Sequence, residues 1–218
     1  MDKNSPTTDI FCLSEVQPEL FSKLEFMLPH FRGFYEVGRF DKVMGLTYGQ
    51  AAFVKRGIEA QILGKVDTFR NVYNDMGFAM SLILTINKKP VYLMNVHGKA
   101  RPGHKLDTPA RARQSQKIIN FLKSKEGPKI IGGDFNLMPS TYAVRLFEKE
   151  DYRNLIKDFE IKSTRNRLSW EQFASGPGFV RQYYADYVFV SPDVKVKNFE
   201  VPNVEISDHL PLILDFEI

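Results

Sequence analysis

The sequence GGDFN, residues 132–136, follows the apolar pair Ile130-Ile131, which is typical of a short buried strand. Its two glycines allow backbone or ligand to approach where a side chain would intrude. Asp134 and Asn136 lie two positions apart, so in an extended segment both side chains leave on the same face. A carboxylate beside a carboxamide suits a hard cation or a polarised water, with the amide donating to a phosphate-like oxygen. Alone, this pentapeptide favours a plain turn at a strand end, where Asp and Asn are common.

Four further strand ends carry polar residues of the same kind. Their motifs are DIFCLSE at residues 9–15, ending on Glu15; NVHG at 95–98, with His97; ADYVFVS at 185–191, with Asp186; and SDHLP at 207–211, with Asp208 and His209. Each has a structural alternative, namely a helix cap, a structural histidine or a turn residue. Five such ends together favour a shared site, because open α/β architectures assemble sites from loops at strand ends.

Composition indicates an ordinary globular protein. The 218 residues are 43% hydrophobic and 26% charged, which is enough for one domain with a substantial core, and we predict a single domain over residues 1–218. The net charge of +4 tilts weakly towards anionic partners. The single cysteine, Cys12, excludes an internal disulfide framework and is expected to be buried. The polar start and the lack of an apolar run of about 18 residues predict a cytoplasmic protein without a membrane segment. We expect a monomer.

The hydrophobic pattern predicts an alternation of strands and helices. Helices are expected from Pro18 to near Pro29, after Thr108, and after Ser140 as N-cap. Strands are expected at 9–15, 51–54, 58–66, 78–86, 91–96, before Asp134, at 187–190 and at 210–216, with a hairpin joining 78–86 to 91–96. Residues 31–50 are interpreted as loop with a short strand, and residues 160–183 as irregular. Hairpins mixed with strand–helix–strand units predict mixed sheets with covering helices.

Taken in order, DIFCLSE, NVHG, GGDFN, ADYVFVS and SDHLP resemble the endonuclease/exonuclease/phosphatase superfamily. These DNase I-like proteins are Mg²⁺-dependent phosphodiesterases and phosphomonoesterases. The resemblance runs from about residue 9 to residue 216, and GDFN followed by DYVFV and SDHLP is its most specific part. It implies an α/β fold, a four-layer α/β/β/α sandwich of two mixed β-sheets flanked by helices.

The resemblance also implies residue roles. Glu15 would be the principal ligand of Mg²⁺, for which Mn²⁺ could substitute, with Asp208 near the metal directly or through water. Asp134 would orient and deprotonate the attacking water, and Asn136 would donate to a phosphate oxygen. His209 would donate to the phosphate as charge develops, with Asp186 fixing its tautomer. His97 would contact the phosphate or protonate the leaving oxygen.

One departure from the family pattern concerns the first strand. Family members normally begin with a strand carrying a Trp-Asn or similar pair whose Asn joins the metal site, whereas here only MDKNSPTT precedes the Glu15 strand. Absence of this first strand would expose an apolar sheet edge and leave the metal site without one of its ligands. A catalytically impaired, truncated domain is therefore one of the alternatives.

The substrate is predicted from the basic and aromatic residues outside these motifs. Arg101 and Lys105 in a basic loop, continued by Arg111 and Arg113, could follow a nucleic-acid backbone or form a solvated helix start. Arg165 and Trp170 could form a substrate lip on which a base stacks. The preferred function is a metal-dependent nuclease that hydrolyses phosphodiester bonds by in-line attack of water. The alternative enzyme is a phosphatase or phosphodiesterase of small or lipid phosphoesters.

Overall fold

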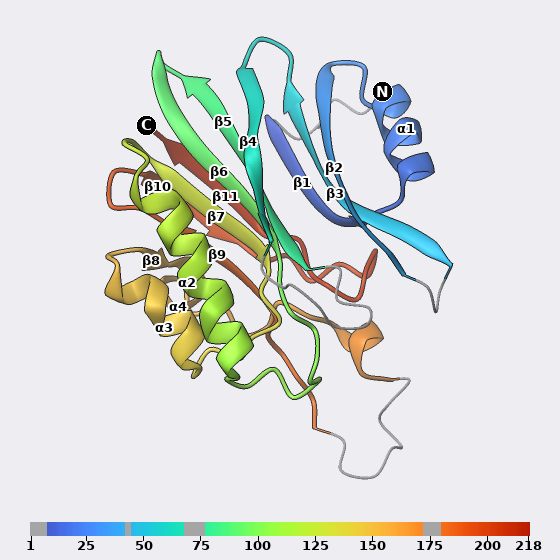
Figure 1. Ribbon diagram of the computed structural model, residues 1–218, viewed down its shortest axis with the longest axis vertical. Helices are drawn as coiled ribbons and strands as arrows, with labels where there is room; N and C mark the ends of the chain where they lie inside the picture. Colours follow the sequence, from blue (N-terminus) through green and yellow to red (C-terminus); the bar gives the residue numbers. More distant parts are fainter. Residues whose placement is uncertain (1–7, 42–44, 68–76, 172–179) are drawn as a thin grey trace.

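The computed structural model describes residues 8–41, 45–67, 77–171 and 180–218. Figure 1 shows the elements in their arrangement. In chain order they are β1 (Ile10–Val16), α1 (Pro18–Met27), β2 (Phe31–Asp41), β3 (Leu46–Lys55), β4 (Glu59–Asp67), β5 (Phe78–Ile86), β6 (Lys89–His97), α2 (Pro109–Lys123), β7 (Lys129–Asp134), α3 (Tyr142–Lys149), β8 (Arg153–Asn154), α4 (Leu155–Asp158), the short 3-10 helix η1 (Arg167–Ser169), β9 (Asp186–Val190), β10 (Lys195–Glu200) and β11 (Ile213–Glu217).

The largest sheet has six strands in the order β4-β5-β6-β7-β9-β8. The pair β6–β7 is parallel, and α2 lies between these strands in sequence, as a parallel connection requires. All other pairs in this sheet are antiparallel, including β5–β6, which confirms the predicted hairpin. Strands β5, β6 and β9 are buried along most of their length because both faces of this sheet are covered.

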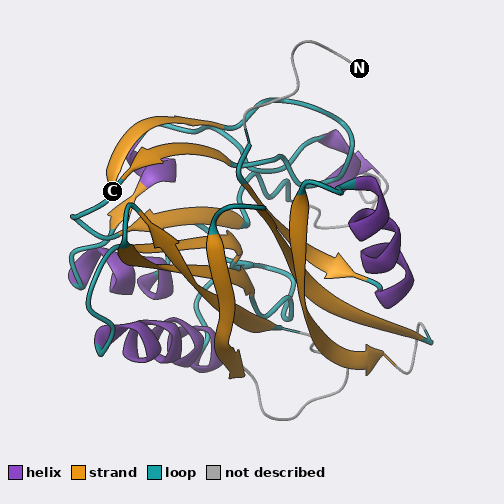
Figure 2. Ribbon diagram, turned by 90° about the horizontal axis from the view of Figure 1, so that it is seen from above, coloured by secondary structure: helices purple, strands orange, loops and turns teal. Residues whose placement is uncertain are grey.

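The second strand layer consists of two separate antiparallel pieces, β1-β3-β2 and β10-β11. The main core cluster takes residues from β2, β3, β10 and β11 together with the six-stranded sheet, so both pieces pack their inner faces on that sheet. A second cluster joins α1 to the other face of β1-β3-β2. Figure 2 shows helices on both outer sides of the strands. The four-layer α/β/β/α sandwich is thus confirmed, although parallel pairing occurs only in the larger sheet.

Phe135, between the two polar residues of GGDFN, anchors this stretch in the core. Its side chain is fully buried and meets Phe147, Tyr187 and Phe189 edge-on, with ring centroids 5.4–5.7 Å apart. Such aromatic contacts stabilise beyond the area they bury. Strand β7 ends at Asp134, and Asn136 beyond it has a φ of 54°, so the chain turns at the end of the sheet on either side of this buried ring.

Several local predictions were wrong. Residues 31–50 contain most of two long strands, β2 and β3, where we expected mainly loop. The N-cap of α3 is Thr141 and not Ser140. Strand β10 and the short elements β8 and α4 were not predicted. Cys12, expected to be buried, is exposed on β1.

We predicted that the first strand of the family is missing, and residues 1–7, on which this prediction depends, lie outside the described residues. Within the part of the chain that the structure describes, β1 and β11 each stand at an edge of their sheet. None of the described helices is long and apolar enough to cross a membrane. The single-domain organisation stays a prediction.

Candidate active site

Strand register brings three of the predicted site residues side by side. His97 at the end of β6 is the register partner of Asp134 at the end of β7, and Asp134 is in turn the partner of Asp186 at the start of β9. The amide of Gly98 donates to the Asp134 carbonyl at 2.6 Å and continues this alignment past the strand ends. The predicted convergence of strand ends therefore has a direct geometric basis in the pairing of β6, β7 and β9.

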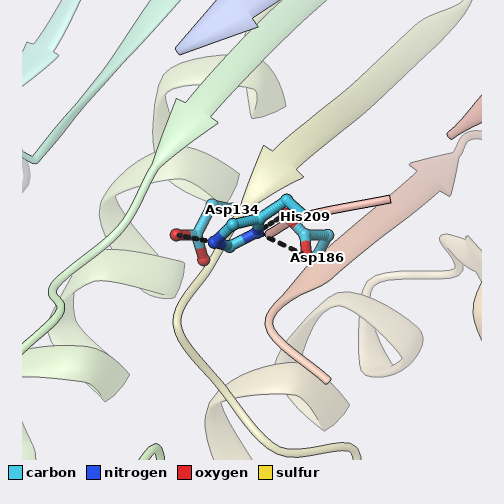
Figure 3. A group of neighbouring side chains, drawn as sticks. All are labelled: Asp134, Asp186 and His209. Atoms are coloured by element: carbon cyan, nitrogen blue, oxygen red, sulfur yellow. Dashed lines mark hydrogen bonds and ion pairs between the residues drawn. The ribbon is translucent and has the colours of Figure 1, made fainter. Parts of the chain in front are cut away.

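His209 completes a cluster with the two aspartates (Figure 3). Its Nδ1 lies 2.9 Å from both carboxylate oxygens of Asp186, while its Nε2 lies 4.0 Å from Asp134 Oδ2. One ligand atom from each of the three residues lies within 4.8 Å of the others. Burial alone would lower the pKa of His209, but the hydrogen bond with Asp186 and the neighbouring carboxylates outweigh it and raise the pKa to about 9. At neutral pH the imidazole is therefore a cation with one N–H directed into the site.

Thr164 holds the segments that carry Asp186 and His209 next to each other. Its hydroxyl accepts hydrogen bonds from the amides of Ala185 and Asp186, at 3.1 and 3.2 Å. Its carbonyl accepts from the Leu210 amide at 2.9 Å, next to His209. A buried side chain in the segment that we interpreted as irregular thus fixes the distance between Asp186 and His209.

Asn136 holds the carboxylate of Asp134 with two of its groups. Its backbone amide donates to Asp134 Oδ1 at 2.7 Å, and its side-chain Nδ2 donates to Asp134 Oδ2 at 2.9 Å and to the Gly98 carbonyl at 3.3 Å. Asn136 is only 4% exposed. Both side-chain N–H groups therefore already have acceptors, and a phosphate oxygen would have to replace one of them.

Glu15 approaches from the other strand layer. The pairing of β1 with β3 shifts register between Leu13 and Val16, and Glu15 inside this bulge has a φ of 58°. Such a conformation costs a non-glycine residue about 1–3 kcal/mol and is characteristic of functional positions. It places Glu15 Oε1 3.4 Å from Nε2 of the buried His97. These two predicted residues thus form a pair at the same end of the sandwich.

Asp208 and two cations border the His209 cluster. Asp208 Oδ2 lies 3.7 Å from His209 Nε2 and accepts a hydrogen bond from Arg165 at 3.1 Å. Burial opposes it, but the charges of His209 and Arg165 lower the pKa of Asp208, so its carboxyl group is ionised. On the other side the ammonium group of Lys105 donates to Asn136 Oδ1. Asp208, Arg165 and Lys105, three of the predicted site residues, therefore lie in or beside the His209 cluster.

Comparison with protein families gives a match over residues 1–209 to the model of the endonuclease/exonuclease/phosphatase family. The chain belongs to this family. Its members are phosphoester hydrolases, which agrees with the resemblance carried by the five motifs. A comparison with curated proteins found no match.

Solved structures of the endonuclease/exonuclease/phosphatase family share the fold. A family protein from Bacteroides vulgatus is 22% identical with a TM-score of 0.74, over 96% of this chain and 85% of that one. The mannosyl-6-phosphatase Bt3783 of Bacteroides thetaiotaomicron is 18% identical with a TM-score of 0.69, again over 96% and 85%. TDP2 of D. rerio, solved with a single-strand DNA product, is 16% identical with a TM-score of 0.70, over 97% and 87%.

Two predicted substrate residues of this family member lie outside the hydrogen-bonded cluster. Arg101 is exposed in the loop between β6 and α2. Trp170 packs edge-on against Tyr183 with ring centroids 5.4 Å apart, and the Arg181 guanidinium lies 5.8 Å from its ring centre. A role in substrate binding stays a prediction for both.

Arg111 corrects the interpretation of the basic loop. We expected it to follow a nucleic-acid backbone or to be solvated, but it is fully buried. Its guanidinium donates to the carbonyls of Lys99, Ala100, Pro102 and Leu106 at 2.7–3.2 Å. Arg111 is therefore the centre around which the loop folds.

Sequence reasoning also missed Asn95 and Thr164. Asn95 is 3% exposed in β6 and donates to the Leu13 carbonyl of β1 at 3.0 Å, which links the two strand layers beneath Glu15 and His97. A polar amide within the apolar run VYLMNV was the available signal for Asn95, because buried polar groups are normally hydrogen-bonded. Thr164 gave no comparable signal, since its neighbours show no periodicity.

The donor set fits a hard divalent cation. Carboxylate oxygens from Glu15, Asp134, Asp186 and Asp208 lie at one end of the sandwich together with imidazole nitrogens. Among the described residues, ligand atoms of Asp134, Asp186 and His209 lie within 4.8 Å of one another. Mg²⁺ is typically bound by one or two carboxylates and keeps several waters. Because the protonated imidazole of His209 has no lone pair to offer, the carboxylates are the groups of this set that could hold the metal.

Proposed function

We propose that this chain is a Mg²⁺-dependent phosphodiesterase, and that it acts as a nuclease through in-line attack of water. The observation that carries the proposal is the His209 cluster. There an imidazolium is held by Asp186 through Nδ1 and directs its Nε2 towards the carboxylate that Asn136 orients. This places a proton acceptor and a proton donor next to each other, with Nε2 of His209 4.0 Å from Oδ2 of Asp134.

Asp134 is the proposed acceptor of the proton of the attacking water. The carboxylate is 14% exposed, and Asn136 already fixes the orientation of both oxygens. Holding a base in one geometry raises the rate because the reacting groups need no further ordering in the transition state. The same contacts satisfy one lone pair on each oxygen, which leaves others for water.

His209 is the proposed donor to the phosphoryl oxygens. Its positive charge is maintained by Asp186, and its hydrogen bond to the phosphate strengthens as negative charge develops. His97, buried beside Glu15, is the proposed contact to the phosphate or to the leaving oxygen. Asp186 acts on the reaction through His209, as a positioning residue.

Glu15 and Asp208 are the residues that would hold the metal. When bound, Mg²⁺ would supply a Lewis acid that neutralises charge on the phosphoryl oxygens. The strained conformation of Glu15 supports this assignment, because nothing in the pairing of β1 with β3 requires a charged side chain at the bulge. Mn²⁺, which also prefers oxygen ligands, is expected to substitute.

Nucleic acid is the preferred substrate. Arg101 and the Trp170–Arg181 pair offer a cation and a stacking surface to a polyanion with aromatic bases. The fold is shared with TDP2 of D. rerio, which was solved with a single-strand DNA product. We further propose a cytoplasmic, monomeric enzyme.

A small phosphomonoester is the second candidate. Two cations, Lys105 and Arg165, lie next to the cluster in addition to His209, and a terminal phosphate carries one more negative charge than a diester. The mannosyl-6-phosphatase Bt3783 shares this fold, which supports the candidate. Lipid phosphoesters fall under the same candidate.

The proposal is tested by hydrolysis of plasmid DNA, bis-p-nitrophenyl phosphate and p-nitrophenyl phosphate, with Mg²⁺ or with EDTA. We expect Mg²⁺-dependent cleavage of the two diesters, with Asp134→Ala and His209→Ala each lowering kcat at least about 100-fold. Asp158→Ala and His30→Ala are the matched controls, since both residues are exposed and lie on other elements.

The pattern of failure separates the alternatives. Turnover of the monoester alone would replace the nuclease by a phosphatase. Mg²⁺-independent cleavage, or cleavage that survives both substitutions, would overturn the assigned site. No turnover of any substrate by folded protein would favour the catalytically impaired domain.

A further inference from the structure

Lys105 is a lysine in a place where lysines are rare. It is 6% exposed, has a φ of 55°, and lies in the loop between β6 and α2. Fully buried lysines occur almost only where the charge has a partner. The partner here is the side-chain oxygen of Asn136, a residue of GGDFN. The burial of Lys105 therefore ties this loop to the most specific motif of the chain.

The backbone of Lys105 is tied to the same segment. Its carbonyl accepts a hydrogen bond from the Met138 amide at 2.8 Å, two residues beyond Asn136. The rest of the loop is fixed by Arg111, whose guanidinium bonds to four of its carbonyls. The planar fork of an arginine holds such carbonyls in one arrangement. Lys105 thus reaches Asn136 from a rigid support.

The contact with Lys105 settles which way the Asn136 amide faces. Because Oδ1 accepts from the ammonium, Nδ2 must face the other way, where it donates to Asp134 Oδ2 and to the Gly98 carbonyl. A hydrogen bond from a cation also polarises the amide, which strengthens the bonds that its N–H groups donate. The hydrogen bonds are therefore donated in one direction, from Lys105 to Asn136 and from Asn136 to Asp134, which is the proposed base.

We propose that Lys105 is a positioning residue that acts through Asn136 to hold the Asp134 carboxylate. The inference rests on the proposed function of Asp134 and gives Lys105 a different role from direct binding of the substrate. Direct binding predicts that loss of Lys105 weakens substrate affinity. Positioning predicts that affinity is kept and the rate of the chemical step falls.

The kinetic test is a double-mutant cycle with Lys105→Met and Asn136→Ala on bis-p-nitrophenyl phosphate and Mg²⁺. We expect Lys105→Met to lower kcat about 10- to 100-fold, the usual cost of misplacing a catalytic group, with KM changed less than about threefold. The double variant should be at most about twofold slower than Asn136→Ala alone, since the amide that links the lysine to Asp134 is gone and only the direct attraction between the two charges is left. Lys162→Met, at an exposed position, is the matched control.

A second readout needs no turnover. In ¹⁵N NMR spectra the side-chain amide of Asn136, identified by its loss in Asn136→Ala, should be protected from solvent exchange in the native protein. Lys105→Met should shift this amide and speed its exchange at least about tenfold, while Lys105→Arg should retain part of the protection. Melting temperatures identify any variant that fails to fold.

Each outcome has one meaning. Additive losses of rate in the cycle, a raised KM with unchanged kcat, or an unchanged Asn136 amide in Lys105→Met would overturn the positioning role. If the native protein hydrolyses no phosphoester but the Asn136 amide responds to Lys105→Met, the positioning contact stands and the proposed function fails.

Discussion

His209 illustrates how opposing effects decide the charge of one residue. Its side chain is 29% exposed, and the removal of water around it disfavours the imidazolium. The bond to Asp186, together with Asp134 and Asp208, reverses this preference and raises the pKa to about 9. The ionisation state on which the mechanism depends is therefore a property of the carboxylates around the ring, and Asp186 contributes most.

Asp186→Asn is predicted to lower the pKa of His209 in the metal-free protein. The substitution keeps a hydrogen-bond partner but removes the largest favourable charge, so the pKa should fall by about one to three units, the usual effect of a close ion pair. As pH rises, the variant ring then loses its proton earlier than the native ring. NMR titration of the imidazole measures both values. Asp193→Asn, on the loop after β9, is the control, and an unchanged pKa in Asp186→Asn would contradict the pairing.

At the scale of elements, the parallel pair β6–β7 depends on a single glycine. Gly133 has a φ of 124°, and a Cβ there would lie 2.2 Å from the Val96 carbonyl oxygen. At Gly132 a Cβ would meet Val188 at 3.6 Å and the Tyr187 carbonyl oxygen at 3.8 Å, both ordinary contacts. The sequence argument treated both glycines alike, whereas the close approach occurs only at Gly133.

Gly133→Ala is accordingly predicted to cost more stability than Gly132→Ala. We expect a loss of at least about 2 kcal/mol for Gly133→Ala, because both backbone strain and a clash with backbone atoms apply. Gly132→Ala should stay within about 1 kcal/mol. Urea unfolding of the three proteins measures the difference. Equal losses for both variants would show that β7 can shift away from β6.

Element prediction succeeded where a turn or a helix-start signal marks the bounds of an element, and it failed for β2 and the first half of β3, which have no such signal. The β5–β6 hairpin has a clear turn signal, and α1 and α2 begin with proline. Strands β2 and β3 lack alternation because Phe34, Ala52 and Val54 face the main core while Tyr35 and Phe53 face α1. Their aromatic and small residues then resemble an irregular segment.

At the scale of the whole molecule, the site depends on the contact between two strand layers. Glu15 comes from β1 in one layer and His97 from β6 in the other, and Asn95 joins these strands through its bond to the Leu13 carbonyl. Arg165 and Asp208, from two loops, close the site on the side of β9. No single layer therefore contains the complete set of residues.

Asn95→Ala is predicted to weaken the contact between the two strand layers, because it removes the hydrogen bond between β6 and β1. It leaves the Leu13 carbonyl without its donor, so the unfolding free energy should fall by about 1–3 kcal/mol. The Mg²⁺ concentration for half-maximal activity should rise, since Glu15 is no longer held beside β6. Ser81→Ala, on the neighbouring strand β5, is the control, because the Ser81 hydroxyl has no hydrogen-bond partner among the described residues. If the Mg²⁺ requirement of Asn95→Ala is unchanged, the hydrogen bond between Asn95 and Leu13 does not position the proposed metal ligand Glu15.

The sequence alone predicted the chemical groups of the candidate site and determined the kind of fold that carries them. Five strand ends with acid, amide or imidazole, in a recognisable order, were sufficient because strand ends are set by local pattern. Only the tertiary structure decided which groups meet. The bond of Lys105 to Asn136 and the turn of Glu15 towards His97 join segments far apart in the chain, and the burial of Arg111 depends on how the loop before it folds back on its side chain. Such contacts follow from strand register, loop packing and backbone strain, which no local pattern of residues encodes.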